Sequence, residues 1–413
     1  MYFIEKFKKN GYFYQCTNET RLTDLSSGTN KICAYIGFDC TAKSLHVGSM
    51  LQIMILRLLQ QYGHKPIILL GGATTKIGDP TGKDTMRKML SDSEIQENKS
   101  GIKKVLEKFI KFGSESSDAI ILDNSDWLEK FNYIEFLRNF GAHISVNKML
   151  TMESSKQRLE RQEHLSFLEF NYMLFQAIDF YHLNKEFNCI LQIGGSDQWG
   201  NIVMGVDLIH KLTGKEAFGL TTPLVTTSSG KKMGKTERGA IWLDENMLSS
   251  YEYFQFWRNI DDNDLLKFAK YFGEYEDIEY KEFELEVKNN INTAKKLFAL
   301  RITSKTHGKA SAENALKSAE ALFEEDNIID ILPTYNLNNE EFGQEILAYK
   351  LFALCNLVDS NKKGRELIKG GGAQINGDKI IEENFLITNK DFQQNGYIKL
   401  SAGKKNHIIV KLC

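Results

Sequence analysis

The stretch LHVGSMLQ, residues 45–52, decides the fold of the N-terminal half of this chain. It lies between an apolar run, ICAYIGF (residues 32–38), and a periodic helical pattern that reaches Gln61. A His-x-Gly step between a strand and a helix puts the imidazole of His46 beside a helix N-terminus. Such a terminus offers unpaired N–H groups and a partial positive charge to a phosphate. Gly48 has no side chain and lets a nucleotide ring approach the backbone closely.

The residues around this stretch predict an open, parallel α/β sheet. Residues 45–61 carry apolar side chains on one broad face, and PIILL (66–70) reads as the next strand. Strand, helix and strand in this order form a βαβ unit with a right-handed crossover. The pattern returns at residues 189–212, where the strand CILQI precedes a polar turn and a second helix. Ligands of such sheets bind beyond the carboxyl ends of the strands.

Composition and charge exclude several classes of protein. The chain has 413 residues, 42% hydrophobic and 26% charged, which is typical of a soluble protein with two or three domains. The net charge is −2, so a basic surface for nucleic acid must be local. The sequence shows no signal-peptide core and no apolar run of about 18 residues, so no membrane span is expected. Six scattered cysteines without a C-x-x-C pair favour a reducing cytoplasm and argue against a structural zinc site.

Shifts in composition predict four segments. Residues 1–244 form the α/β domain, with a helical insertion at about 126–165 that ends in basic residues. Residues 245–325 are helix-rich, acidic and aromatic, and residues 326–345 resemble a linker. The tail, 346–413, carries eleven Lys and Arg against six Asp and Glu, and an Asn-Gly pair in it predicts a β-hairpin.

A second motif, KKMGKT (residues 231–236), lies in a Ser- and Gly-rich loop at 228–238. Such a loop can close over a triphosphate and place the ammonium groups of Lys232 and Lys235 where charge builds in a transition state. The alternative is a solvated basic turn, and His46 alone is equally compatible with an ordinary loop histidine. Together, the two motifs predict a nucleotide site.

The loop GGATTKIGDPTGK (residues 71–83) resembles a phosphate-binding P-loop but departs from its pattern. Only three residues separate Gly78 from Gly82, and Asp84 follows the lysine where Ser or Thr is required. The chain also lacks G-x-G-x-x-G. These departures argue against a Walker ATPase and a dinucleotide dehydrogenase, and they leave Asp79 as a partner for an ammonium group.

The apolar helix expected at 166–183 carries a polar stripe formed by Tyr172, Gln176 and Asp179. A buried carboxylate and a buried amide need hydrogen-bond partners. An internal hydrogen-bond network would supply them, and so would a small polar ligand.

An amino acid with a phenol fits this stripe. Its ammonium would meet Tyr172, Gln176 and Asp79, and its hydroxyl would meet Asp179 and Tyr35. In the turn GGSDQWGN (194–201), Gly195 and Asp197 are suited to ribose hydroxyls and Gln198 to a carboxylate. As plain structure, the same turn is a tight helix cap.

The motifs occur in the order YIGFDCTAKSLHVGS, GGATTKIGDPTGK, the polar stripe, QIGGSDQWGN and KKMGKT. In this order the chain resembles the bacterial-type tyrosyl-tRNA synthetases, class I aminoacyl-tRNA synthetases, over nearly its whole length. The basic tail resembles the S-four-like RNA-binding module of that family. The tryptophanyl enzymes are the nearest relatives, but they usually lack this tail and do not need the Tyr35 and Asp179 pair.

The resemblance implies a Rossmann-like catalytic domain with a helical insertion, an α-helical anticodon-binding domain and a small α+β S-four-like domain. It implies a cytoplasmic homodimer, joined through 126–165, that couples L-tyrosine to tRNA(Tyr) with ATP as substrate and Mg²⁺ accompanying ATP. The basic stretch at 148–161 would meet the acceptor end of the tRNA, and the tail its body. The rival hypotheses are another adenylyl- or nucleotidyl-transferase and a non-catalytic RNA-binding protein on a synthetase scaffold.

The resemblance also assigns roles to individual residues. The α-phosphate and the leaving pyrophosphate would be stabilised by His46, Thr41, Lys232 and Lys235, with Lys83 and Arg87 on the pyrophosphate side. Adenosine would be held by Asp39, Gly48, Gly195 and Asp197. Tyrosine would be held by Tyr35, Asp79, Tyr172, Gln176, Asp179 and Gln198.

Two positions depart from the family pattern. Ser49 stands where His or Asn is common, at a position that touches the ribose. Cys40 stands where proline is usual, and we expect it to leave its loop more flexible and to put a thiol near the nucleotide.

Overall fold

The computed structural model describes residues 2–79, 90–236, 239–321, 332–338, 342–343, 345–392, 396–403 and 406–412. The chain divides into two compact units, Met1–Glu313 and Asn314–Cys413. No helix among the described residues is both long enough and apolar enough to span a membrane.

The first unit is built on a six-stranded sheet with the order β1-β6-β5-β2-β3-β4. Its strands are β1 (Gln15–Cys16), β2 (Cys33–Asp39), β3 (Lys65–Gly71), β4 (Ile120–Asp123), β5 (Cys189–Gly195) and β6 (Phe218–Thr222). All neighbours are parallel except β1, which pairs antiparallel with β6. The chain runs outward from β2 through β3 to β4, and then returns to β5 on the other side of β2. The strand order therefore reverses between β2 and β5, where open sheets bind their ligands. This confirms the predicted α/β class.

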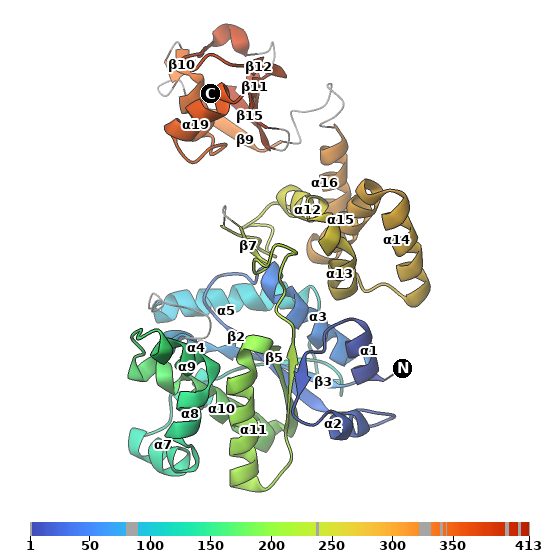
Figure 1. Cartoon of the computed structure of the whole chain (residues 1–413), viewed down its shortest axis with the longest axis vertical. Helices are drawn as coiled ribbons and strands as arrows, with labels where there is room; N and C mark the ends of the chain where they lie inside the picture. The colour runs from blue at the N-terminus through green and yellow to red at the C-terminus, as the bar shows by residue number, and fades with distance from the viewer. Residues whose placement is uncertain are drawn as a thin grey trace. The chain divides into compact units, whose positions relative to one another are not determined.

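Helices cover both faces of this sheet (Figure 1). On one face lie α3 (Val47–Gln61) and α5 (Asp92–Glu107), and on the other α10 (Phe167–Phe187) and α11 (Trp199–Thr213). Successive side chains of a strand point to opposite faces of the sheet, so each strand contributes to both layers. On the face covered by α10 and α11, Tyr35, Ile67 and Leu69 pack into one core with these helices. The short helix α4 (Gly72–Ile77) continues directly from β3.

The insertion between β4 and β5 is helical, as predicted. It contains α6 (Ser125–Leu128), α7 (Tyr133–Asn139), α8 (Val146–Thr151) and α9 (Glu153–Glu160). Its basic residues are not all directed to solvent. Arg158 is only 6% exposed, and it donates hydrogen bonds to the His164 carbonyl at 2.7 Å and to Glu169 at 3.3 Å. The expectation that this residue faces RNA is therefore wrong, because its guanidinium is buried and bonded to the His164 carbonyl and to Glu169 of α10.

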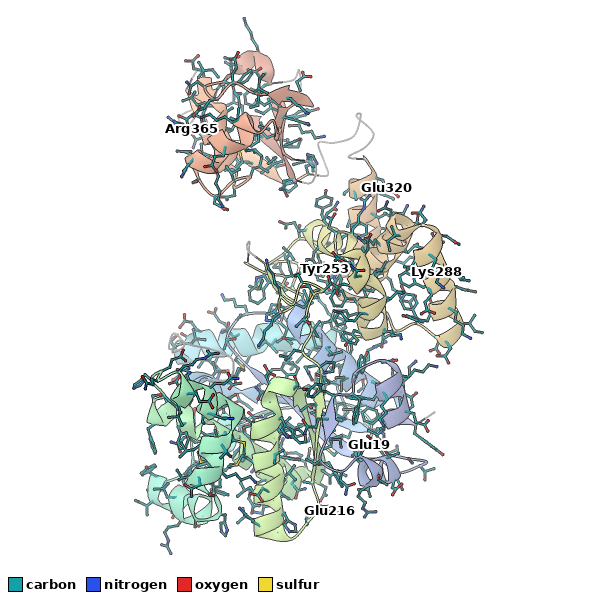
Figure 2. All side chains as sticks on the ribbon, in the orientation of Figure 1. Glu19, Glu216, Tyr253, Lys288, Glu320 and Arg365 are labelled. Atoms are coloured by element: carbon teal, nitrogen blue, oxygen red, sulfur yellow. The ribbon has the colours of Figure 1, made fainter. Side chains whose placement is uncertain are left out.

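A bundle of helices follows the sheet within the same unit. It consists of α12 (Ser250–Arg258), α13 (Asp262–Phe272), α14 (Asp277–Asn289) and α15 (Ile291–His307), and α16 (Lys309–Ala321) comes next in the chain. Its core is aromatic, with the ring of Trp257 in edge contact with Phe268, Phe272 and Phe298. Tyr253, labelled in Figure 2, is also buried in this core.

The second unit holds a five-stranded sheet with the order β12-β11-β14-β15-β9. The strands are β9 (Thr334–Leu337), β11 (Ala373–Ile375), β12 (Asp378–Ile380), β14 (Tyr397–Ala402) and β15 (Asn406–Leu412). A strand pair, β10 (Glu345–Leu347) with β13 (Leu386–Thr388), and the helices α18 (Ala348–Leu354) and α19 (Asn361–Lys369) complete it.

Two features of this unit bear on the sequence analysis. The predicted hairpin joins β11 to β12, with positive φ at both Asn376 (51°) and Gly377 (94°). Strand β9 lies inside the segment 326–345 that was expected to be a linker, and it pairs in parallel with β15. Part of that segment therefore belongs to the C-terminal sheet.

Candidate functional site

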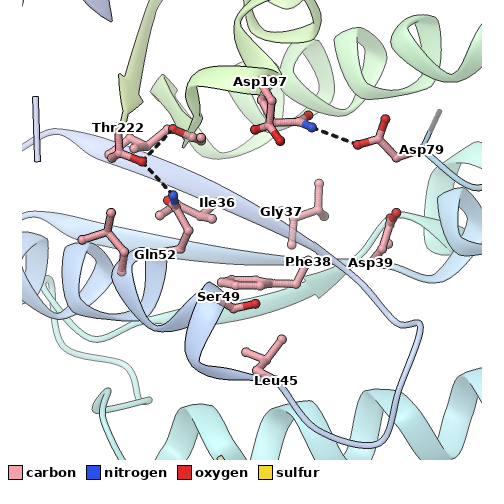
Figure 3. Close-up of a pocket in the computed structure, with 18 of the residues that line it drawn as sticks. Ile36, Gly37, Phe38, Asp39, Leu45, Ser49, Gln52, Asp79, Asp197 and Thr222 are labelled. Atoms are coloured by element: carbon pink, nitrogen blue, oxygen red, sulfur yellow. Dashed lines mark hydrogen bonds between the residues drawn. The ribbon is translucent and has the colours of Figure 1, made fainter. Parts of the chain in front are cut away.

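A cavity of about 450 Å³ opens where the strand order reverses. Its walls come from the carboxyl ends of β2, β3, β5 and β6, the start of α3, the polar stripe of α10 and the lysine loop (Figure 3). Thirteen of the predicted site residues line it: Tyr35, Asp39, Thr41, His46, Gly48, Asp79, Tyr172, Gln176, Asp179, Gly195, Asp197, Gln198 and Lys232. Lys83 and Arg87 lie outside the described residues, and Lys235 begins the short strand β7 (Lys235–Thr236).

The His-x-Gly turn begins α3. His46 is the N-cap of that helix, and its Nδ1 accepts the Gly48 N–H at 3.0 Å. Because Nδ1 is the acceptor, the neutral ring carries its proton on Nε2. The turn thus fixes the ring and its tautomer at the helix N-terminus.

The lysine loop packs directly against this turn. A Cβ built on Gly48 would lie 2.7 Å from the Met233 carbonyl oxygen, and one on Gly234 would lie 2.7 Å from the Gly48 nitrogen. Gly234 also has φ +92°, which disfavours other residues. The loop backbone thus approaches Gly48 closely, as does the ring of His46, whose Cε1 would lie 2.6 Å from the same Cβ. The structure brings the two motifs of the sequence together, and a glycine on each side permits the contact.

Backbone hydrogen bonds extend this contact on both sides. The Val47 N–H donates to the Ile241 carbonyl at 2.9 Å, and the Leu243 N–H donates to the Leu45 carbonyl at 2.9 Å.

Across the cavity, Lys232 Nζ lies 3.8 Å from Asp197 Oδ2, and the Lys232 side chain is 58% exposed. Burial raises the pKa of Asp197 although the Lys232 ammonium opposes the shift. Lys232 is therefore a cation at the mouth of an acidic cavity.

The inner end of the cavity holds Tyr35 and Asp179, which are 1% and 3% exposed. The Asp179 carboxylate accepts hydrogen bonds from Asn124 Nδ2 at 2.9 Å and Trp127 Nε1 at 2.8 Å. Burial raises its pKa to about 7, against the effect of these two donors. The internal network that the sequence left open is thus present. The Tyr35 hydroxyl, in contrast, is buried with no hydrogen-bond partner among the described residues.

A network of hydrogen bonds between amide and carboxylate side chains links the remaining polar residues. Gln198 Nε2 donates to Asp79 Oδ2 at 2.9 Å, and Asn201 Nδ2 donates to both Gln176 and Gln198 at 3.1 Å. The Tyr172 hydroxyl donates to the Asp39 carboxylate at 3.3 Å. Several carboxylates around one cavity create a negative potential, which suits a ligand with an ammonium group.

Sequence reasoning missed several residues that shape the cavity. Asn201 lies in the quoted turn, three residues after Gln198, so helical spacing could have revealed it. Asn124 and Trp127 follow β4 and meet Asp179 only through the fold, so no local pattern marks them. Gln192 lines the cavity from β5, and its Oε1 has no partner within the described part of the chain.

The two departures from the family pattern have structural accounts. Cys40 is held on both sides of its backbone, because its N–H donates to Thr75 Oγ1 at 2.7 Å and its carbonyl accepts from Asn98 Nδ2 at 2.8 Å. The expectation of a more flexible loop is therefore wrong, since proline could not make the first bond. The thiol is fully buried, and burial raises its pKa to about 12, so it stays protonated. Ser49 lines the cavity (Figure 3).

No group of three or more His, Cys, Asp or Glu side chains among the described residues is arranged to hold a metal ion. The polar atoms that line the cavity are hydrogen-bond donors and acceptors, and Lys232 adds a cation. The arrangement suits binding and charge stabilisation of organic anions and ammonium groups.

Comparison with known proteins shows which family the chain resembles. Residues 27–324 match the family described as tRNA synthetases class I (W and Y), and residues 324–410 match the tyrosine–tRNA ligase SYY-like C-terminal domain. The chain is 57% identical over 412 residues to the tyrosine–tRNA ligase of Rickettsia massiliae (strain Mtu5), covering 100% of both.

Among solved structures, a C-terminally truncated mitochondrial tyrosyl-tRNA synthetase from Aspergillus nidulans matches with a TM-score of 0.70 and 29% identity, over 78% of this chain and 94% of that one. The tyrosyl-tRNA synthetase of Archaeoglobus fulgidus, solved with L-tyrosine, shares the fold at a TM-score of 0.55 and 19% identity, over 76% of this chain and 100% of that one.

Proposed function

The chain belongs to the class I tRNA synthetase family of the tryptophan and tyrosine enzymes, and we propose how its residues perform the tyrosine–tRNA ligase reaction. The enzyme activates L-tyrosine with ATP to tyrosyl-adenylate and pyrophosphate, and then transfers the tyrosyl group to the terminal adenosine of tRNA(Tyr). This conclusion rests on the 57% sequence identity, over the full length of both chains, to a protein named tyrosine–tRNA ligase. The match of residues 324–410 to a tyrosine–tRNA ligase domain separates it from a tryptophan enzyme.

The phenol of tyrosine is proposed to bind between Tyr35 and Asp179. The Tyr35 hydroxyl lacks a partner among the described residues, and a phenol hydroxyl would supply one. Asp179 accepts two hydrogen bonds, and a carboxylate has room for more than two. Phenylalanine would leave the Tyr35 hydroxyl unpaired, so the buried pair discriminates against it.

The ammonium and carboxylate groups of tyrosine are proposed to bind the network of amide and carboxylate side chains. Asp79, Tyr172 and Gln176 would hold the ammonium, and Gln198 would reach the carboxylate. The hydrogen bonds that link Gln198 to Asp79 and Asn201 to Gln176 support this assignment, because they hold those side chains in place before the substrate enters.

ATP is proposed to bind across the contact between the His-x-Gly turn and the lysine loop. Asp39, Gly48, Gly195 and Asp197 would hold adenosine. The pentacoordinate α-phosphate and the pyrophosphate would be stabilised by His46, Thr41, Lys232 and Lys235, together with Lys83 and Arg87. Mg²⁺ would enter with the triphosphate, with no resident metal.

The first step needs no general base, because the tyrosine carboxylate is already the nucleophile. It attacks the α-phosphorus in line, and pyrophosphate leaves. Catalysis is then positioning and charge stabilisation, which the Nε2–H donor of His46 and the Lys232 ammonium provide.

The remaining segments are assigned by their charge and their surface. Residues 245–325 are proposed to meet the anticodon, and residues 346–413 the body of the tRNA. Helix α19 supports the second assignment, because it presents Lys362, Lys363, Arg365 and Lys369 around a buried Ile368.

We assign the enzyme to the cytoplasm, since all five described cysteines are free thiols.

The helical insertion is proposed to join two copies of the chain. Its helices and the start of α10 expose an unusual number of large apolar side chains, which mark protein contacts when they cluster. They are Tyr133, Ile134, Leu137, Val146, Leu150, Leu159, Phe167 and Leu168.

The function is tested by exchange of labelled pyrophosphate into ATP, which should require tyrosine and Mg²⁺. His46→Ala should slow exchange by roughly 10²–10³-fold without changing the Kd of tyrosine, because the ring acts on the phosphate. His210→Ala, an exposed histidine on α11, is the matched control and should change neither quantity. Exchange with another acid, or no exchange at all, would favour the rival functions. An equal loss of tyrosine binding in His46→Ala would contradict its role.

Tyrosine binding should depend on pH through Asp179. Its pKa is about 7 in the free enzyme, and a phenol that donates to the carboxylate favours the ionised form. Binding must then displace the Asp179 proton at low pH. Affinity should therefore fall by up to about tenfold per pH unit below this pKa and level off above it. Calorimetry across this pH range measures the Kd of tyrosine.

Two variants separate Asp179 from other titrating groups. Asp179→Asn should bind more weakly but lose the pH dependence, and His46→Ala should keep it. A pH-independent Kd in the unmodified enzyme would show that the phenol does not bind the charged carboxylate.

Removal of residues 325–413 should spare pyrophosphate exchange and weaken tRNA charging. The cut falls where the two family models meet, so it keeps β9 with its own sheet. Charging by the full chain should be strongly salt dependent, and less so after truncation, because phosphate contacts are lost. Loss of exchange in the truncated enzyme would mean that the domain division is mistaken.

The dimer is tested by analytical ultracentrifugation. The double variant Ile134→Asp and Phe167→Asp should sediment as a monomer, because charges in an apolar contact lose their hydration. Ile278→Asp changes a residue of α14 that is 75% exposed outside the insertion, and it should remain a dimer. A monomeric unmodified enzyme would overturn the assignment.

A further inference from the structure

Helix α13 of the helical bundle is bonded to the base of the lysine loop. Its Asp264 is only 2% exposed although it is a carboxylate, and its Oδ2 accepts the Ser228 N–H at 2.9 Å. Lys267, three residues later, lies 2.9 Å from Oδ1 of the same carboxylate. The Lys267 ammonium also donates to the Thr226 carbonyl at 2.7 Å. Two side chains from one turn of α13 therefore hold two loop residues, Thr226 and Ser228.

These loop residues form one side of a small hairpin. The Met233 N–H donates to the Val225 carbonyl at 2.7 Å, the Thr227 N–H donates to the Lys231 carbonyl at 2.9 Å, and Thr226 bridges to Lys232. The other side of the hairpin carries Lys232 and Met233. A displacement of Thr226 or Ser228 is thus transmitted to Lys232 by short, direct backbone bonds.

The hairpin is consequently held from both sides. Met233 and Gly234 lie against Gly48 at the nucleotide end, while Asp264 and Lys267 hold it at the helical end. Hydrogen bonds to charged groups are stronger and more directional than neutral ones, and burial reduces their screening. The helical end is therefore a defined anchor for a loop whose tip, residues 228–232, is exposed.

We infer that Asp264 and Lys267 are positioning residues for ATP activation, which set the pose of the lysine loop over the cavity from the helical bundle. They touch no substrate and act through Ser228 and Thr226. The inference rests on the proposed role of the lysine loop. It gives the helical bundle a physical route to the phosphate chemistry, since movement of α13 displaces the cation that faces Asp197.

The test compares Asp264→Asn and Lys267→Met in the full-length enzyme. Both should slow pyrophosphate exchange by roughly three- to thirtyfold and raise the KM for ATP, since coupling through a packed segment has that size. The Kd of tyrosine and the Tm should stay close to those of the unmodified enzyme. Lys267→Arg, which keeps the donors, should restore most of the rate.

Limited trypsin digestion reports the loop pose without relying on activity. Cleavage after Lys231 and Lys232 should be faster in Asp264→Asn and Lys267→Met than in the unmodified enzyme. Lys270→Met is the matched control, because Lys270 is on the same helix with its ammonium 5.5 Å from the Tyr280 ring centroid. It should leave both cleavage and exchange unchanged.

Lys232→Ala, measured in parallel, separates this inference from the proposed function. If Lys232→Ala exchanges normally, the role of the loop itself is wrong. If Lys232→Ala is slow while both α13 variants exchange normally, the positioning role of α13 is wrong. Slow exchange with unchanged loop cleavage, or with weakened tyrosine binding, also overturns it. Should Asp264→Asn fail to fold, Lys267→Met and Lys267→Arg carry the test alone.

Discussion

The close backbone contact between the His-x-Gly turn and the lysine loop is the constraint on which the site depends. Residues almost two hundred positions apart meet at Gly48 and Gly234, where a single added methyl group would lie 2.7 Å from the opposite backbone. The contact puts a helix N-terminus, a fixed imidazole and the exposed Lys232 cation around one space. In the proposed reaction the tyrosine carboxylate is the nucleophile, so this arrangement of charge would supply the chemistry of activation.

The inner end of the cavity is built from buried polar groups. Asp179 is buried beside two fixed donors, and burial raises its pKa because it disfavours the charged carboxylate. Tyr35 adds a buried hydroxyl that a phenol can satisfy. In the proposed reaction, specificity for tyrosine and activation by phosphate chemistry belong to different ends of one cavity. Hydrogen bonds of Gln198 and Asn201 link polar residues of the same cavity.

The sequence predicted the fold and most of the cavity, because its signals are local. Apolar runs marked β2, β3 and β5, and polar turns at their ends marked the residues that now line the cavity. What it could not predict depends on neighbours distant in the chain. Cys40 suggested a flexible loop, yet Thr75 and Asn98 hold its backbone. Arg158 suggested a basic surface, yet Glu169 and the His164 carbonyl hold it inside. Asn124 and Asp264 gave no local signal, since their partners are contributed by other elements.

The most direct test of the central claim is a double-mutant cycle of Gly48→Ala and Gly234→Ala, measured as the single-turnover rate of tyrosyl-adenylate formation. Each methyl group should separate the same two segments, so each variant should be slow with its tyrosine Kd unchanged. The double variant should then be little slower than either single one. If the two losses instead multiply, or if neither variant is slow, the turn and the loop do not act as one phosphate site.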